Sequence, residues 1–250
     1  NDPNAITKYT RPRLGVLISG GVIDSMVNHY TASKKPRSKD VYSPGGKTGI
    51  RPDRCTIVYS NMVRHAFGNI PIIIGGTEAS LRRFAHYDYW QNKVRKSILI
   101  DSGADLISFG MGEKSIIQIA DKLRDGIPVS HITNIKGICY LADKPPKSAQ
   151  IIPSFEEVCA DKEKYALAYA TQYYEQDFKR GRVLCQKHGE KYVVQLMQSE
   201  PLTQKEMDKV YALKYTRRWH PIYDKDGGIP ALEEVKFSIT SSRGCFGSCS

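Results

Sequence analysis

The sequence contains no long hydrophobic run: nowhere do about 18 apolar residues follow one another, the length that a membrane-spanning helix needs. Acidic residues are also few, with 26 Asp and Glu against 37 Lys and Arg, so the formal net charge is +11. The first feature argues against a membrane span in this chain. Together the two features predict a soluble globular protein of the cytoplasm whose basic surface suits anionic partners.

Three motifs that identify common ligand-binding folds are missing. The turn at Gly20-Gly21 lacks the G-x-G-x-x-G pattern of dinucleotide-binding folds. Gly46-Lys47-Thr48 resembles the end of a P-loop, but the first glycine of that motif would fall at position 41, which is Val41. No histidine follows an aspartate by two residues, as a histidine ligand of cobalamin in an Asp-x-His-x-x-Gly motif would. We therefore do not expect histidine-ligated cobalamin; cobalamin bound without a histidine ligand stays an open alternative.

Cysteines are scattered along most of the chain. Four of the six stand alone among apolar residues, where cysteine usually serves as a small core residue. A chain of 250 residues is also too long for a small disulfide-stabilised secreted scaffold, so a reducing compartment is favoured. Only Cys245 and Cys249 lie close together. The four isolated residues are Cys55, Cys139, Cys159 and Cys185.

Short apolar runs that end in glycine turns organise the first half of the chain. Residues 13–19, 71–74 and 105–109 have the composition of buried parallel strands, and helix-like stretches follow them. This alternation predicts an α/β domain with a parallel sheet. Helices are expected at residues 22–31, after an N-cap at Asp53, at 92–101 and after Glu113, and a further strand at 132–141.

The second half predicts a helix, a hairpin and another helix. Ser/Thr-x-x-Glu capping boxes begin at Ser154 and Thr203, and each predicts a helix start. The runs 183–186 and 192–197 flank a His-Gly-Glu turn, which is typical of a β-hairpin. The first of these helices is expected to be long, continuing to Gly181.

A long basic loop is expected at residues 31–52, which are rich in glycine, proline and cations. From Lys34 to Arg54, seven basic residues stand against two acidic ones, Asp40 and Asp53. Long loops inside compact domains are usually either functional or disordered. The glycines and cations favour an anionic ligand here; a solvated basic surface is the simpler alternative.

The segment 77–90 is dense in charged and aromatic side chains and directly follows an expected strand. Open α/β sheets bind ligands at the carboxyl ends of their strands, so Glu78, His86 and Asp88 are candidate catalytic residues on the substrate side. The alternative is a surface loop packed by its own aromatic side chains. The aromatic neighbours of these candidates are Tyr87 and Trp90.

The end of the sequence carries its most specific motif. Residues 235–240 alternate between apolar and polar side chains and predict a half-buried strand. Cys245 and Cys249 follow in a loop of small residues, and thiolates suit iron–sulfur clusters. Gly244 and Gly247 would let this loop turn tightly. In a C-x-x-x-C-x-x-C motif the third cysteine would fall at position 252, so we expect the chain to be part of a longer protein.

These residues together resemble the YgiQ-like family of radical-SAM proteins. The resemblance spans nearly the whole chain. It implies a Rossmann-like, cobalamin-binding-like α/β domain at 1–147 and a helical and β-hairpin connector at 148–232. Residues 233–250 would then be the first strand and partial cluster loop of a truncated (β/α) radical-SAM barrel. The matching stretches are Asp24–Ala32, Arg51–Arg54, Gly75–Trp90, Asp101–Asp105, Gly110–Glu113 and Arg243–Cys249.

The resemblance also implies a reaction. A [4Fe–4S] cluster would reduce S-adenosylmethionine by one electron and yield a 5′-deoxyadenosyl radical, which takes a hydrogen atom from a small or macromolecular substrate. Cys245 and Cys249 would be iron ligands, and Phe246 and Gly247 would contact the cofactors. An electron donor such as flavodoxin or ferredoxin would be a partner. Without the third cysteine and the barrel, this fragment alone is expected to be inactive.

Two other functions fit parts of the sequence. The first is a basic α/β module that binds RNA or another polyanion without catalysis, with the two terminal cysteines incidental; its binding would weaken steeply with salt. The second is a structural zinc site formed by Cys245, Cys249 and ligands further along the chain. Iron or zinc content separates the zinc site from the radical enzyme.

Overall fold

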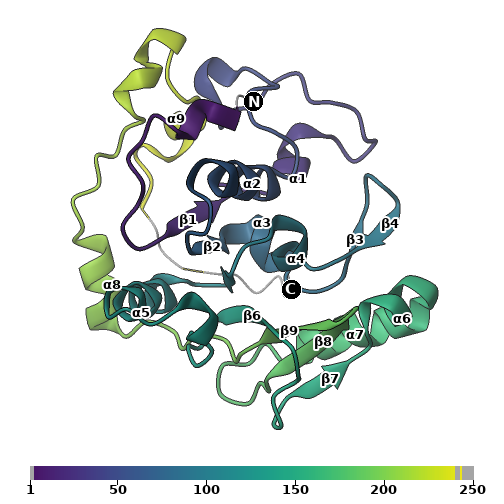
Figure 1. Cartoon of the computed structure of the whole chain (residues 1–250). Helices are drawn as coiled ribbons and strands as arrows, with labels where there is room; N and C mark the ends of the chain where they lie inside the picture. Colours follow the sequence, from purple (N-terminus) through teal and green to yellow (C-terminus); the bar gives the residue numbers. More distant parts are fainter. Residues whose placement is uncertain (1–2, 240–242, 244–250) are drawn as a thin grey trace. The chain divides into compact units, whose positions relative to one another are not determined.

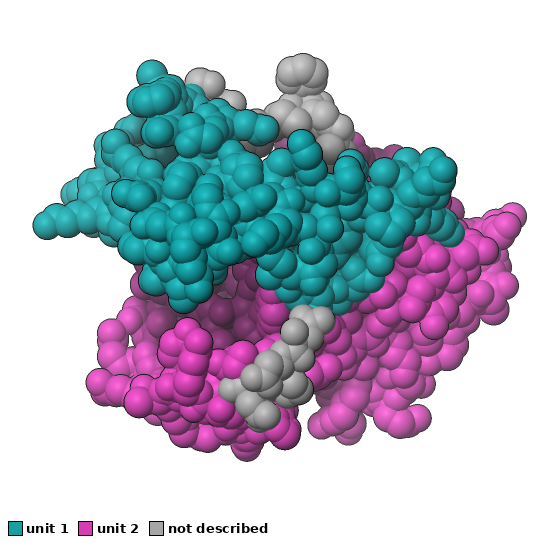
Figure 2. All heavy atoms as spheres, turned by 90° about the horizontal axis from the view of Figure 1, so that it is seen from above, with its two compact units in different colours: residues 1, 25–53, 202–250 teal, residues 2–24, 54–201 magenta. Residues whose placement is uncertain are grey.

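The computed structural model describes residues 3–239 and residue 243 (Figure 1). The chain divides into two compact units, which Figure 2 colours separately. We call them the sheet unit, formed by residues 2–24 and 54–201, and the loop unit, formed by residues 25–53 and 202–250 together with residue 1. This division differs from the three consecutive domains that the resemblance implies, whose boundaries stay a prediction.

Short strands form the centre of the sheet unit. In the described chain they are β1 (Val16–Ser19), β2 (Ile72–Gly75), β3 (His86–Asp88), β4 (Lys93–Arg95), β5 (Leu106–Ser108), β6 (Ile138–Ala142), β7 (Gln150–Ile152), β8 (Leu184–His188) and β9 (Lys191–Gln195). Seven of them form one sheet in the order β1-β2-β5-β6-β9-β8-β7, and β3 pairs with β4 as a separate hairpin. The strands expected at 13–19, 71–74 and 105–109 are confirmed as β1, β2 and β5.

Helices cover both faces of this sheet (Figure 1). They are η1 (Pro3–Ile6), α2 (Cys55–Phe67), α3 (Gly76–Leu81), α4 (Ile98–Ser102), α5 (Glu113–Arg124), η3 (Val129–His131), α6 (Phe155–Ala160) and α7 (Lys162–Tyr174). Successive side chains of a strand point to opposite faces. Ile72 and Ile74 of β2 therefore pack in one core cluster with Val63 of α2, whereas Ile73 packs in a second cluster with Ile119 of α5.

The sheet is mixed, which corrects the prediction of a parallel sheet. β1, β2 and β5 run parallel, but β6 is antiparallel to both β5 and β9. Residues 125–137, which follow α5, lead the chain back to the carboxyl end of β5. β6 therefore begins beside the end of β5 and runs antiparallel to it. β8 and β9 are joined by the two-residue turn Gly189-Glu190, and so short a connection can only join antiparallel strands. The predicted hairpin is thus confirmed, but as part of the same sheet.

Helix α2 begins differently from the prediction. Its N-cap position is Arg54 rather than Asp53, and Arg54 makes no side-chain cap. The carboxylate of Glu78 takes this role, because its Oε1 accepts a hydrogen bond from the backbone N–H of Thr56 at 3.0 Å. Sequence patterns predict an N-cap only from residues next to the helix start. Here the cap comes from Glu78 of a different helix, which accepts the hydrogen bond of the Thr56 amide.

Two predicted helices are shorter or interrupted. The segment 92–101 contains β4 and then α4, whose start is capped by the side chain of Ser97. The long helix expected after Ser154 is divided into α6 and α7 at Asp161, whose carboxylate caps the second helix. Both predicted capping boxes, at Ser154 and Thr203, are confirmed. These errors arose because Ser and Asp within an apolar pattern can begin a new helix as well as continue an old one.

The loop unit brings together two distant parts of the sequence. Its helices are α1 (Ser25–His29), η2 (Pro44–Gly46), α8 (Gln204–Tyr211), η4 (Pro221–Asp226) and α9 (Ala231–Val235). The N–H of Gly45 donates to the carbonyl of Gly228 at 2.8 Å, and the N–H of Ala231 donates to the carbonyl of Val41 at 2.9 Å. The expected basic loop therefore exists, and backbone hydrogen bonds tie it to the later segment.

The last described residues, up to 239, do not form the strand predicted at 235–240. The strand predicted at 235–240 is absent up to residue 239: α9 ends at Val235, and a turn follows. Phe237 and Ile239 are each 92% exposed, so in this part of the chain no neighbouring strand buries the alternating apolar side chains. The predicted cofactor ligands lie outside the described residues; they are Cys245, Phe246, Gly247 and Cys249.

The core clusters lead to a first prediction. Ile74 is fully buried in the cluster between β2 and α2, so Ile74→Ala should lower the free energy of unfolding by about 2–5 kcal/mol. Ile117→Ala on α5 is the control, because that side chain is 62% exposed and its loss should change stability by about 0.5 kcal/mol or less. Urea unfolding monitored by circular dichroism would measure both values, and equal losses would contradict the assigned core.

Candidate functional site

Three glycine-containing turns meet at the carboxyl ends of β1, β2 and β5. They contain Gly20-Gly21, Gly75-Gly76 and Gly110. Gly76 has a φ of +78°, and a Cβ built on it would lie 2.9 Å from Oγ of Ser19. Only glycine allows both this backbone conformation and this close approach. Open α/β sheets bind ligands at this edge, so the turns mark the first candidate site.

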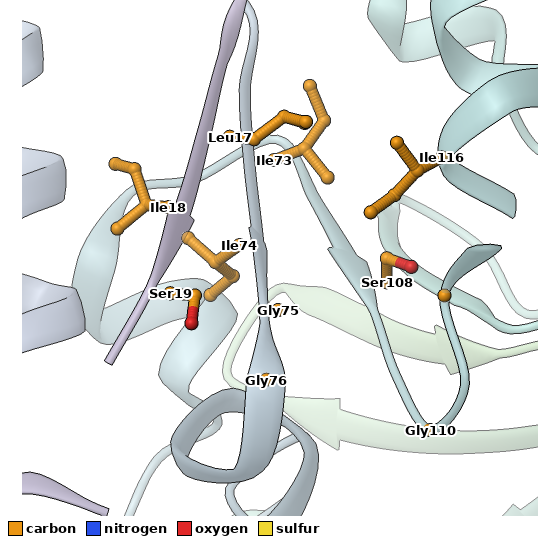
Figure 3. A pocket seen from close by; sticks show the side chains of 11 residues that line it. Leu17, Ile18, Ser19, Ile73, Ile74, Gly75, Gly76, Ser108, Gly110 and Ile116 are labelled. Atoms are coloured by element: carbon orange, nitrogen blue, oxygen red, sulfur yellow. The ribbon is translucent and has the colours of Figure 1, made fainter. Parts of the chain in front are cut away.

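A cavity of about 190 Å³ lies against these strands and the start of α5. Figure 3 shows Leu17 and Ile73 next to each other, with Ile116 of α5 on the other side of the space. The polar lining is sparse and engaged: Oγ of Ser19 accepts from the N–H of Gly21 at 3.0 Å, and Ser108 shares a hydrogen bond with Ser115. Ligand pockets usually have about 300–1,000 Å³, so this apolar cavity suits only a small group.

Glu78, the first of the predicted catalytic candidates, lies buried in α3. Only 1% of it is exposed. Besides capping α2 through Thr56, its carboxylate accepts a hydrogen bond from the thiol of Cys55, with Sγ and Oε2 3.6 Å apart. Glu78 therefore has a defined structural role: it connects α3 to the first turn of α2, where the positive end of the helix dipole favours a carboxylate.

Asp88 is also buried and paired. Its Oδ2 accepts two hydrogen bonds from the guanidinium of Arg54, at 2.6 and 3.0 Å, and its Oδ1 accepts one from the N–H of Gln91 at 2.9 Å. Burial by itself would raise the pKa of Asp88, but the Gln91 amide and the Arg54 guanidinium outweigh it, so the pKa lies below its usual value. Asp88 is consequently ionised at neutral pH and suited to binding a cation or donor rather than to giving up a proton.

Two further ion pairs surround this pair in the sheet unit. Arg82 pairs with Asp24, which is 3% exposed, and Arg95 binds Asp101 with its Nη2 at 2.7 Å. Burial lowers the pKa of Arg82 to about 10; nearby Asp88 opposes this change, while Arg95 adds to it. Arginine–aspartate pairs therefore hold the segment 77–90 to its surroundings. Charges fixed in this way can position a ligand.

His86 is held neutral. Its Nδ1–H donates to the carbonyl of Phe84 at 3.2 Å. Burial, together with the positive charge of Arg82, lowers its pKa to about 4. The hydrogen-bonded Nδ1 fixes the tautomer that leaves Nε2 as an acceptor, so His86 can bind a donor but is not a proton donor at pH 7.

Sequence analysis missed a second histidine near His86. His188 of β8 is 4% exposed, stacks on Phe155 with ring centroids 5.5 Å apart, and donates from Nε2 to the side-chain oxygen of Gln186 at 3.0 Å. Burial lowers the pKa of His188 to about 4. Sequence analysis placed it in the expected hairpin turn, whereas it is the last residue of β8. Alternation along β8 shows why it is buried: Leu184 and Gln186 point the same way, and both are buried.

Among the described residues, no group of three or more His, Cys, Asp or Glu side chains is arranged to hold a metal ion. The four described cysteines form no disulfide with one another and stand at separate places; three are buried and Cys159 is exposed. Of the predicted site, the structure thus places Glu78, His86 and Asp88 in the sheet unit. The cysteine pair is not placed.

Comparison with known proteins identifies the family. Residues 1–238 match the family described as radical SAM N-terminal. The chain belongs to the radical SAM N-terminal family. The membership in a radical-SAM family that the sequence motifs implied is therefore confirmed.

Relatives of this radical SAM N-terminal chain are longer than the chain itself. A UPF0313 protein of Clostridium botulinum (strain 657) is 59% identical over 252 residues, which cover 100% of this chain and 39% of the relative. A UPF0313 protein of Clostridium perfringens (strain ATCC 13124) is 58% identical over 246 residues, covering 97% of this chain and 37% of the relative. The chain thus spans about two-fifths of the length of these curated relatives. No solved structure matches the chain. None of its described helices combines the length and the apolar character needed to cross a bilayer.

The Arg54–Asp88 pair generates a second prediction. Asp88→Asn leaves the Arg54 guanidinium, whose side chain is 19% exposed, without its counter-charge, so stability should fall by about 3 kcal/mol. The matched control is Asp121→Asn, which breaks the exposed pair of Asp121 with Arg124 on α5 and should cost about 0.5 kcal/mol or less. Chemical denaturation of both variants would measure the difference, and similar small losses would show that the buried pair is dispensable.

His188 generates a third prediction, on pH. Its folded pKa of about 4 lies below the ordinary 6.5, so between these values the unfolded state binds more protons and stability must fall as the pH falls. Each such histidine contributes about 1.4 kcal/mol per pH unit in this window. His188→Gln should remove one histidine's share of the slope, measured by urea unfolding from pH 7 to pH 5. His131→Gln, at an exposed position, should leave the slope unchanged.

Proposed function

We propose that this chain is the amino-terminal part of a radical-SAM enzyme that binds a [4Fe–4S] cluster and S-adenosylmethionine. The observation that carries the proposal is the family match over residues 1–238, followed directly by the Arg243-Gly244-Cys245-x-Gly247-x-Cys249 motif. Cys245 and Cys249 would supply two of the thiolates that such a cluster needs. When bound, the cluster would supply the electron that cleaves S-adenosylmethionine to methionine and a 5′-deoxyadenosyl radical.

The protein's own contribution is positional. The four described cysteines stand at separate places, which supports the proposal that the terminal pair would be the cluster ligands. Phe246 and Gly247, between the two thiolates, would contact the bound cofactors. In this proposal the connector leads into a (β/α) barrel formed mainly by the part of the longer protein that follows this chain. An oxygen-sensitive cluster requires a reducing compartment, so the proposed location is the cytoplasm, where flavodoxin or ferredoxin would donate the electron.

The sheet unit would serve as a rigid platform on the substrate side. Its ionised Asp88, neutral His86 and buried Glu78 lie at or after the carboxyl end of β2. Arg54 holds Asp88, the carbonyl of Phe84 holds His86, and the N–H of Thr56 holds Glu78. Fixed dipoles and charges of this kind orient a substrate without reorganising during the reaction. We assign these residues to positioning, because each carboxylate already has partners and His86 is not protonated at neutral pH.

The proposal is tested on the full-length protein, of the relatives' length, reconstituted without oxygen with iron and sulfide. We expect the iron of one [4Fe–4S] cluster per chain, and 5′-deoxyadenosine when S-adenosylmethionine and reduced flavodoxin or ferredoxin are added. Cys245→Ala should lose both the cluster and the product. Cys159→Ala is the matched control, since this cysteine is exposed and alone, and it should retain both.

Three results would overturn the proposal. Zinc in place of iron would assign the terminal cysteines to a structural metal site. A protein that takes up no iron under these conditions, or that loses equal amounts of iron in the two cysteine variants, would show that Cys245 has no special role as a ligand.

A further inference from the structure

Residues 209–219 of the loop unit are basic and aromatic, and they have no part in the proposed function. We call them the basic–aromatic segment. It contains no Asp or Glu, and four of its eleven residues are cations: Lys209, Lys214, Arg217 and Arg218. Aromatic residues recur at every fourth position, namely Tyr211, Tyr215 and Trp219. Cations interleaved with aromatic side chains suit a ligand that carries both phosphates and flat bases.

The basic–aromatic segment is open to solvent. Helix α8 ends at Tyr211, and Figure 1 shows the chain after it as an irregular stretch that leads to η4. Every residue from 211 to 218 is exposed, and the exposed fractions of Tyr211 and Tyr215 are 48% and 54%. Exposed apolar side chains that are grouped, rather than scattered singly, mark interaction sites.

Tyr215 is held in place although its ring is exposed. Its hydroxyl donates a hydrogen bond to the carbonyl of Val210, in the last turn of α8, at 3.0 Å. Its backbone N–H donates to the carbonyl of Leu213 at 2.8 Å. Both the side chain and the backbone of Tyr215 are therefore tied to the end of α8. A ring fixed in this way can stack on a base with little further loss of conformational entropy.

Trp219 ends the segment in a fixed position. Its Nε1–H donates to Oδ1 of Asp224 at 2.7 Å, and its ring lies against Gly228, where a Cβ would be 2.3 Å from Cζ2 of the indole. The guanidinium of Arg218 lies 5.7 Å from the ring centroid of Trp219 and binds Oδ1 of Asp224 at 3.0 Å. Asp224 thus offsets the charge of Arg218, and we do not count Arg218 among the cations that a ligand can use.

The other three cations of the segment have no internal partner. Lys209, Lys214 and Arg217 form no hydrogen bond or ion pair within residues 3–239 and 243. Two acids of α8 precede the segment: Glu206 belongs to the capping box, and Asp208 accepts from Nε2 of Gln204 at 2.7 Å. Both keep their negative charge. Residues 205–219 still contain five cations against these two acids, so the positive excess remains.

The backbone at Arg217 is unusual. Its φ is +53°, in the left-handed region that residues other than glycine rarely adopt. Such conformations cost stability and cluster where proteins bind ligands. An arginine without an internal partner at this bend supports a binding role for the segment over that of a solvated linker.

We propose that the basic–aromatic segment binds single-stranded nucleic acid. Lys209, Lys214 and Arg217 would contact phosphates, and bases would stack on Tyr211 and Tyr215. Bases in a duplex already stack on one another, so exposed aromatic rings favour an unpaired strand. The open surface suits a polymer, whereas a small ligand is usually enclosed in a cavity. The proposal is independent of the radical reaction, because none of these residues belongs to the cysteine motif.

The test is the fluorescence anisotropy of labelled strands of about 12 nucleotides, titrated with the full-length protein at about 0.1 M salt. One strand is oligouridine RNA and the other is oligothymidine DNA; binding of either supports the proposal and identifies the source of the strand. Tyr215→Leu should weaken binding about fivefold or more, because one stacked base is lost. The control is Tyr174→Leu, at a tyrosine of α7 that is 78% exposed, and it should change affinity about twofold or less.

Lys214→Gln tests the phosphate contacts separately from stacking. The affinity for a single strand should fall as salt rises, and losing one phosphate contact should make the slope of log affinity against log salt concentration shallower by about 0.7. Lys162→Gln is the control: it removes the same charge from an exposed residue at the start of α7 and should leave this slope unchanged.

The proposal fails on any of three results. The first is that neither strand binds. The second is that a duplex of the same length binds as tightly as the single strands, since charge alone would then explain binding. The third is an equal loss of affinity in Tyr215→Leu and Tyr174→Leu. Thermal unfolding without nucleic acid checks that each variant is folded, and if Tyr215→Leu is not, Lys214→Gln decides.

Discussion

The parallel pairing of β2 between β1 and β5 is the constraint on which the sheet unit depends. Ile72, Ile73 and Ile74 are all at most 2% exposed, so β2 is buried on both faces and cannot slip by one residue without moving its side chains between two cores. The chain leaves this strand through Gly75 and Gly76 directly into α3. Glu78 therefore sits two residues past the turn at a position that the strand register determines, and its contact with α2 follows from that position.

The ion pairs show what the charged segment after β2 does. An isolated buried charge would be costly, and each charged residue that sequence analysis selected there has a partner. Asp88 binds Arg54, and Arg82 binds Asp24. Sequence analysis selected this segment because charge beside a buried strand is unusual. It could not identify the ion pairs, because the partners lie 34 and 58 residues away in the chain.

The same contrast between local and distant partners explains which elements were predictable. The capping boxes at Ser154 and Thr203 were predictable from the sequence, because both halves of each interaction lie within four residues. Apolar runs identified β1, β2 and β5. The direction of β6 was not predictable, since the route of the chain after α5 depends on packing and not on local pattern. The N-cap predicted at Asp53 was wrong, because this carboxylate binds His29 and Tyr30 while Glu78 satisfies α2.

Charge counting illustrates the same limit at the scale of a surface. Seven cations against two acids from Lys34 to Arg54 suit either a polyanion on an open surface or a small anion in a cavity. The structure shows where the two acids lie. Asp40 accepts hydrogen bonds from Ser43 and Tyr42, and Asp53 accepts them from His29 and Tyr30. Both carboxylates hold the fold of the loop and keep their negative charge, and the charge of Asp40 interacts with that of Arg51. A count of charges therefore does not give the field of this loop, because it does not say which cations lie beside a carboxylate.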